Sequence, residues 1–446
     1  MIALALMAWA LSIGFFMVRA LAGGAWGNWA QVCLGAGVGV GTVSCCFFGE
    51  LKTGVPSIVF ELVVLAVSVS MCRKKRWRVG APGEATPLNW WLSGAFPVVF
   101  AVVLACALYG FYRQVSSNLN GSWDAFAIWN LHARFLATPW WRDLFTETIG
   151  WTHPDYPLLL PGFIARVWGA EGYPDQSVPV AVAFVFCIAT MGLLGALVAA
   201  LKGRAQGTLA ALFLAATPYF ITQAGSLIAD VPLSFFILAT VALTVIGTGR
   251  GVWGLAGICA GMAAWTKNEG LLLAVVVVAV QVVAMKGRRS QLAWLGAGLG
   301  SVLAVVLVFK VTLATSNGHL GGRSFTDLLR LATDGRRWRL MLVELTKGIA
   351  RFGGLALGIP PVLAAYVALA GVDEKADRRG LLSGLATVGL MLVGYCVVCV
   401  ISPADLQWQI DTALSRLLLQ LWPATLFLAF VGSRYAFART SFWKSS

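Results

Sequence analysis

The sequence predicts an all-α polytopic membrane protein, and three observations carry this prediction. Of the 446 residues, 59% are hydrophobic and only 12% are charged, whereas soluble domains carry about 25% charged residues. Many apolar runs approach the ~20 residues that a helix needs to cross a hydrocarbon core of ~30 Å. The runs are continuous rather than alternating, which excludes a transmembrane β-barrel.

Membrane-spanning helices are predicted for thirteen apolar runs, at about 2–21, 28–48, 54–72, 95–113, 178–201, 207–222, 229–247, 251–266, 270–285, 291–313, 352–370, 381–400 and 417–433. The shortest runs are near the lower limit for a span, so we expect some of them to be bent or partly re-entrant. Glycine stripes at 35–41 and 296–300 predict helices that pack closely.

Basic residues mark alternate ends of these runs and predict their orientation. The strongest cluster, Arg73 to Arg78, lies in the loop that ends an N-terminal group of helices (1–94), before the main region (95–446). The other clusters on the same side contain Lys202, Arg204, Arg250, Lys286, Arg288, Arg289, Arg378, Arg379, Arg434, Arg439 and Lys444. Because basic loops stay cytoplasmic, this side is predicted to face the cytoplasm. Such clusters meet anionic lipid, so the net charge of +14 does not imply a nucleic-acid partner.

The opposite side collects two long loops, 114–177 and 314–351, in which we expect amphipathic helices, and short turns at 223–229, 266–270 and 401–416. The first loop contains a polar island at 123–161. It holds two of the three histidines, four of the nineteen carboxylates and five tryptophans. Titratable groups beside a bilayer are costly and usually functional. We therefore expect the chemistry of this protein on its outer face.

The polar island divides into an amphipathic helix and a rigid turn. The helix is predicted over 123–136, so Asp124 lies in its first turn, where the helix dipole favours an ionised carboxylate. Two prolines fix the backbone of the turn at 153–157. Beside an apolar segment, that turn presents three side chains suited to a polar lipid headgroup, those of His153, Asp155 and Tyr156.

Further polar residues of the outer side come from distant segments. They are Arg134, Asp230, Lys267, Asn268, Glu269 and Arg416. Most of the candidate residues also have a purely structural interpretation. Asp124 and Asp230 could only cap helices, and Lys267 could pair with Glu269 to close a tight turn. His153 and Asp155 could only form the turn, and Arg416 could only contact headgroups.

The nine cysteines are odd in number and lie mostly inside apolar runs. They are interpreted as small hydrophobic residues. Cys396 and Cys399 have the spacing of a CxxC motif, but no histidine lies near them, so no metal or redox centre is predicted there.

Several segments together resemble the GT-C glycosyltransferases, most closely a bacterial branch similar to family 39. This branch resembles protein O-mannosyltransferases and the aminoarabinose–lipid A transferase. The matching segments are Trp123–Asn130 with His153–Leu159, Ala229–Leu233, Thr266–Gly270, and the closing Asp411–Arg416 with its following apolar run. They span about 120–425, and their order and common side make the set specific.

The resemblance implies a GT-C-like bundle and a hexosyl- or pentosyltransferase whose donor is a sugar on a polyprenyl phosphate. The reaction would occur at the periplasmic face of a bacterial inner membrane. Asp124 would be the general base on the acceptor hydroxyl, and Asp230 the second acidic position. Phosphate binding would fall to Lys267, Arg416 and His153. The remaining binding residues would be Asp155, Tyr156, Asn268, Glu269 and Arg134.

The chemistry supports these roles independently. An acceptor hydroxyl needs a base within hydrogen-bond reach, and a departing phosphate gains charge that fixed cations stabilise. Arginine suits phosphate through its forked donors. No cofactor is predicted with certainty, although a divalent cation could bridge Asp124, Asp155 or Asp230 with a phosphate.

Two features depart from the GT-C pattern. Three helices precede the one that leads into the Asp124 loop, and the neighbours of Asp124 are Trp123 and Ala125 rather than a second acid. Two other classes of protein stay open: a transporter or flippase of lipid-linked sugars, and a non-catalytic component of an envelope-glycan assembly machine. Pocket shape, rather than these motifs, selects the sugar, the carrier lipid and the acceptor.

Overall fold

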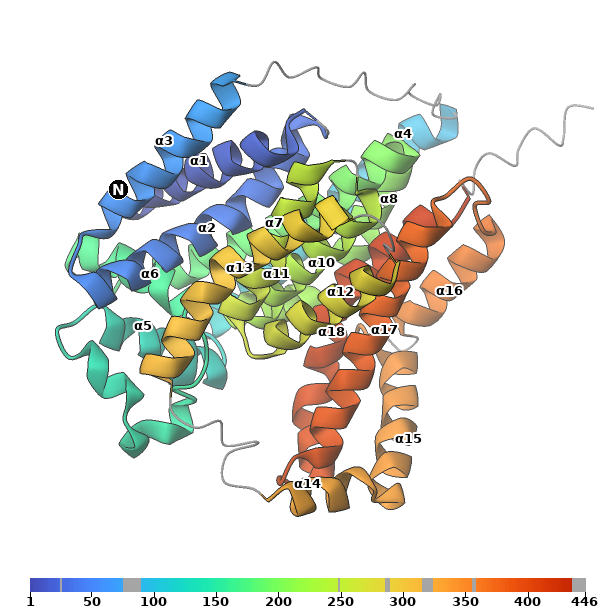
Figure 1. The fold of residues 1–446 in the computed structure, drawn as a ribbon. Helices are drawn as coiled ribbons and strands as arrows, with labels where there is room; N and C mark the ends of the chain where they lie inside the picture. Colours follow the sequence, from blue (N-terminus) through green and yellow to red (C-terminus); the bar gives the residue numbers. More distant parts are fainter. Residues whose placement is uncertain are drawn as a thin grey trace, which may run out of the picture.

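The computed structural model (Figure 1) describes residues 1–24, 26–74, 90–247, 249–284, 289–314, 324–354 and 358–434. Within these ranges the chain is almost entirely helical, and its one β-bridge joins Val372 to Ser433. The helices are α1 (Ile2–Ala22), α2 (Asn28–Thr53), α3 (Ser57–Lys74), α4 (Trp90–Ser117), a π-helix (Ala125–Asn130), α5 (Leu131–Leu136), two 3-10 helices (Trp141–Phe145 and Glu147–Thr152), α6 (Leu159–Glu171), α7 (Ser177–Lys202), α8 (Arg204–Ala215), α9 (Pro218–Gly225), α10 (Asp230–Ile246), α11 (Arg250–Thr266), α12 (Glu269–Ala284), α13 (Arg289–Thr312), α14 (Phe325–Ala332), α15 (Gly335–Arg351), α16 (Ile359–Ala370), α17 (Arg378–Ile401) and α18 (Leu406–Gly432).

The predicted all-α membrane-embedded class is confirmed. Among the described residues, seven helices are long and apolar enough to cross a bilayer, or eight if the bent pair α8–α9 is one span. Three shorter apolar helices, α10, α12 and α16, accompany them. The full count of thirteen spans stays a prediction.

The bounds differ from the predicted runs at three places. The run at 207–222 is divided into α8 and α9, which meet at 64° because Pro218 opens the second helix. Within the run at 352–370, α16 begins at Ile359, and α18 begins at Leu406, eleven residues before the apolar run at 417. The basic residues at 75–78, 286–288 and 435–446 lie outside the described residues.

The glycine stripes predicted close helix packing, and some of their glycines do allow two helix backbones to touch. A Cβ on Gly39 would lie 1.9 Å from the Ala10 carbonyl oxygen, so α2 approaches α1 closely only because this residue is glycine. A Cβ on Gly298 would meet the Gly254 carbonyl at the same distance, between α13 and α11. Gly296 and Gly300, in contrast, have open space beside them.

A buried ion pair ties the N-terminal helices to the segment between α4 and α7. Glu61 of α3 is fully buried and accepts hydrogen bonds from Arg166 Nε of α6 at 3.2 Å and from Trp9 Nε1 of α1 at 2.8 Å. No basic residue lies near Glu61 in the sequence, so its partner comes from a distant segment. Because an unpaired buried carboxylate is costly, these contacts fix α6 against α1 and α3.

Polar contacts mark two opposite ends of the bundle. Arg416 and Gln420, near the middle of α18, reach Asp230 at the start of α10. Ser433 follows the C-terminus of α18, and its carbonyl accepts a hydrogen bond from Lys202 at the end of α7. We call these the Asp230 end and the Ser433 end. Figure 1 shows the segment from α5 to α6 on one side of the bundle and α14 and α15 projecting with the ends of α17 and α18.

Candidate functional site

The centre of the candidate site is a buried carboxylate with three donors. Asp230 is fully buried at the first position of α10. Its Oδ1 accepts hydrogen bonds from Lys267 Nζ at 3.0 Å and Gln420 Nε2 at 2.6 Å, and its Oδ2 from Arg416 Nε at 2.8 Å. A buried charge is tolerated only when paired and hydrogen-bonded. The carboxylate therefore holds these donors together, and it makes no side-chain cap to its own helix.

Arg416 links this buried carboxylate to a second one. Its Nη1 lies 2.7 Å from Asp124 Oδ2, while its Nε contacts Asp230. The Asp124 side chain is 28% exposed, against 0% for Asp230. No donor from the described ranges reaches Asp124 Oδ1. Asp124 is thus the accessible carboxylate of the pair.

The backbone around Asp124 is held by the turn that precedes α10. Ser122 N–H donates to the Ser226 carbonyl at 3.0 Å, and a Cβ on Gly121 would come within 2.7 Å of that same oxygen. Gly121 also has a φ of 76°, which favours glycine. Asp124 then directly precedes a π-helix where an α-helix was predicted. Short π-helical turns are frequent at functional sites.

Lys267 is the second cation of the cluster. Its Nζ lies 2.7 Å from Glu269 Oε1 as well as 3.0 Å from Asp230, so the predicted local ion pair forms but is part of a larger network. Burial alone would lower the pKa of Lys267. The carboxylates of Asp230 and Glu269 outweigh that effect and hold its pKa above the ordinary value, so the ammonium stays charged.

The turn at 153–157 is anchored by Lys310 from the last turn of α13. Lys310 Nζ donates to the Asp155 carbonyl at 2.6 Å and to Asn268 Oδ1 at 2.7 Å. Asn268 Nδ2 completes the triangle with a hydrogen bond to Asp155 Oδ2 at 2.7 Å. The predicted residues Asp155 and Asn268 are therefore brought together by a lysine that the site prediction missed.

Aromatic rings cover the same turn. His153 has a left-handed backbone, with φ 57°, and its ring stacks on Tyr156 at 4.7 Å between centroids. Tyr156 stacks in turn on Trp129 of the π-helix at 5.5 Å. A turn therefore forms at the predicted place, and its rings contact the segment that carries Asp124.

Arg134 was predicted to belong to the site, but it lies outside the cluster around Asp230. It is exposed on α5 and makes none of the polar contacts of the cluster. Its neighbour His132 is buried instead, with Nε2 2.9 Å from the Thr152 carbonyl. Burial lowers the pKa of His132 to about 4, so this histidine is neutral and supports the loop.

Gln420 and Tyr395 extend the cluster and were also missed. Tyr395 Oη donates to Gln420 Oε1 at 2.7 Å, which leaves the Gln420 amide to donate to Asp230. Each lies inside an apolar run of the sequence, as Lys310 does. An isolated polar residue in such a run was the available signal.

The divalent cation that could bridge a carboxylate and a phosphate stays a prediction. In the ranges that the structure describes, no three His, Cys, Asp or Glu side chains gather closely enough to hold a metal ion. The Asp124 and Asp230 carboxylates both contact Arg416.

The fold and the cluster define a membrane-embedded helical protein that gathers four carboxylates and three cations at one end of its bundle. No protein-family model, no curated protein and no solved structure matches the chain. The resemblance to GT-C glycosyltransferases stays a prediction from the sequence segments quoted above.

Proposed function

We propose that this protein is a membrane glycosyltransferase that moves a sugar from a polyprenyl-phosphate-type donor to an acceptor hydroxyl. The observation that carries the proposal is the pairing of an accessible carboxylate, Asp124, with a phosphate-compatible cation, Arg416, 2.7 Å away. Both lie at one end of an apolar bundle. A lipid-linked donor could keep its tail in the bilayer there while its phosphate meets the cluster.

In the proposed reaction, Asp124 Oδ1 accepts the proton of the acceptor hydroxyl. The acceptor oxygen forms a bond to the anomeric carbon as the bond from that carbon to the phosphate oxygen breaks. The electron pair leaves with the phosphate, and the configuration inverts. Protonation of Asp124 neutralises its charge, which frees the exposed part of the Arg416 guanidinium to stabilise the departing phosphate.

Asp230 takes a positioning role in this proposal rather than that of a second acid or base. Its carboxylate is buried and already receives three donors. It fixes Arg416 and Lys267 on the same side of the site, so that neither cation must reorganise when the phosphate gains charge. Asp155 and Asn268 shape the wall that the donor headgroup would contact.

The decisive experiment replaces Asp124 by asparagine in purified protein reconstituted with a polyprenyl-phosphate sugar and a hydroxyl acceptor. We expect product formation to fall at least ~100-fold, the lower bound for losing a general base, while donor binding is retained. Asp143→Asn is the matched control, because Asp143 is exposed in the same segment and outside the cluster. Undiminished turnover in Asp124→Asn would contradict the role of Asp124. Donor lipid that crosses vesicle bilayers without forming product would favour a flippase.

A further inference from the structure

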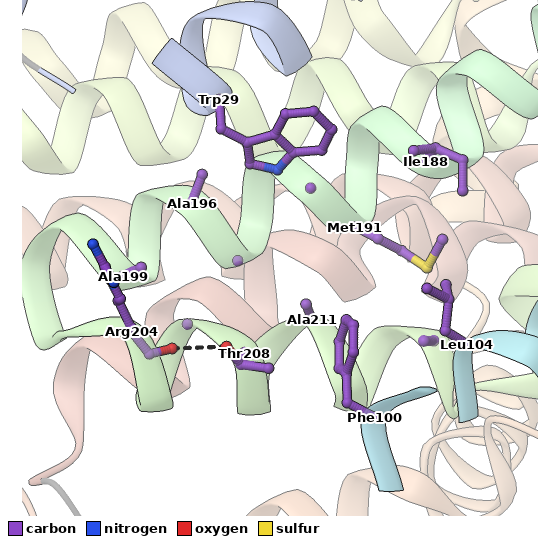
Figure 2. A pocket seen from close by; sticks show the side chains of 14 residues that line it. Trp29, Phe100, Leu104, Ile188, Met191, Ala196, Ala199, Arg204, Thr208 and Ala211 are labelled. Atoms are coloured by element: carbon purple, nitrogen blue, oxygen red, sulfur yellow. Dashed lines mark hydrogen bonds between the residues drawn. The ribbon is translucent and has the colours of Figure 1, made fainter. Parts of the chain in front are cut away.

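An apolar cavity of about 460 Å³ lies along the contact between α7 and α8, bounded by the first turn of α2 and by α4. Figure 2 shows Trp29 on one side of α7, and Phe100 of α4 beside α8. Met191 and Ala196 of α7 also line the cavity. Its volume falls in the range of ~300–1,000 Å³ that is common for ligand sites.

The cavity opens on a surface that suits lipid. Trp29, which lines the cavity, is 58% exposed. Among the lining residues, the Thr208 hydroxyl is satisfied because it donates to the Arg204 carbonyl at 2.9 Å (Figure 2). The interior thus suits a hydrocarbon chain rather than a polar molecule.

One end of the cavity carries a cation. Arg204 is exposed at the start of α8, and no acidic side chain in the described part of the chain pairs with it. Lys202, two residues earlier, is already engaged by the Asp373 carboxylate and the Ser433 carbonyl. This is the Ser433 end of the bundle, opposite the proposed reaction site. The sequence predicts that end to be cytoplasmic.

We infer that this cavity binds one anionic glycerophospholipid, with an acyl chain lying along the contact between α7 and α8 and the phosphate on Arg204. The guanidinium offers forked donors to phosphate oxygens. The indole of Trp29 lies where the apolar cavity meets the rim, a position that tryptophan favours at membrane interfaces. The inference rests on this cavity and this charge alone, so it stands or falls independently of the proposed transferase activity.

The test equilibrates the full chain with vesicles of equal parts phosphatidylglycerol and phosphatidylcholine, then counts retained lipids by native mass spectrometry. Wild-type protein should retain one phosphatidylglycerol in preference to phosphatidylcholine. Arg204→Gln should reduce that preference about fivefold, which corresponds to ~1 kcal/mol for one basic residue at an anionic surface. Ala196→Leu should reduce retention of both lipids by filling the cavity. Arg250→Gln, an exposed arginine at the start of α11, is the charge-matched control and should retain the preference.

A second readout does not depend on any substitution. Phosphatidylglycerol with a photoreactive group in its acyl chain should form adducts with wild-type peptides that contain Met191 or Phe100. Adducts spread evenly over all lipid-facing helices would overturn the inference. So would a wild-type protein without lipid preference, or an Arg204→Gln variant with the wild-type preference.

Discussion

At the scale of single residues, Arg416 connects the two carboxylates of the candidate site. It is the side chain that contacts both the buried Asp230 and the accessible Asp124, through different nitrogens of one planar group. A lysine ammonium cannot reproduce two such contacts in fixed directions. Asp124, Asp230, Lys267 and Arg416 were all named as candidate site residues from the sequence, and the structure brings them into one cluster. Gln420, which also reaches Asp230, was missed, although an isolated polar residue in an apolar run was a signal for it.

Arg416→Lys should therefore lower kcat/KM at least about tenfold even though the positive charge is kept, because a charge-assisted hydrogen bond is worth ~1.5–3 kcal/mol. Turnover and thermal unfolding are measured together. Arg142→Lys is the control, since Arg142 is exposed in the same segment and lies over Trp141 rather than in the cluster. An Arg416→Lys enzyme with wild-type kcat/KM would show that the forked geometry is irrelevant.

At the scale of elements, the segment between α4 and α7 owes its position to contacts that come from elsewhere in the chain. Lys310 of α13 secures the 153–157 turn, and the turn before α10 secures Ser122. The prolines allowed the turn to be predicted, because they act locally. The π-helix after Asp124 was not predicted, because the amphipathic pattern of the segment indicates a helix but not its hydrogen-bond register.

Lys310→Met should loosen the turn, because it leaves the Asp155 carbonyl and the Asn268 amide oxygen without their donor, at a cost of ~1–3 kcal/mol. Hydrogen exchange should quicken in peptides that cover 150–157 and stay unchanged in α10. Lys52→Met is the matched control, since Lys52 is an exposed lysine that bonds Thr312 at the end of the same helix. Equal protection of the turn in both variants would remove Lys310 from this role.

His132 should make the same segment sensitive to acid. Its pKa is about 4 in the folded protein because of burial, below the ordinary 6.5, and no partner within the described residues reaches its Nδ1. The unfolded segment therefore binds the proton more tightly, so stability is full above pH ~6.5 and falls as the pH drops toward 4. Protease susceptibility of the segment should rise over that window. In His132→Gln the rise should be absent, and an identical pH profile would contradict the assignment.

At the scale of the whole molecule, charged side chains gather at two opposite ends of the helical bundle. The Asp230 end gathers the reactive groups, whereas the Ser433 end holds Lys202, Asp373 and Arg204. Composition was enough to predict an all-α membrane protein. It was not enough to place every span, because the apolar run at 207–222 conceals a break at Pro218.

Orientation of the whole chain is the premise on which an outer-face transferase depends, and it can be measured directly. Thr138 is exposed in the segment between α4 and α7, and Lys375 is exposed in the turn before α17. The basic clusters predict that these positions lie on opposite sides, with Thr138 outside. A membrane-impermeant maleimide added to intact bacterial cells should label Thr138→Cys, and should label Lys375→Cys only after the membrane is permeabilised. The unsubstituted chain reports labelling of native cysteines. The reverse pattern would place the Asp230 end in the cytoplasm, where a lipid-linked sugar waiting on the outer leaflet could not reach Asp124.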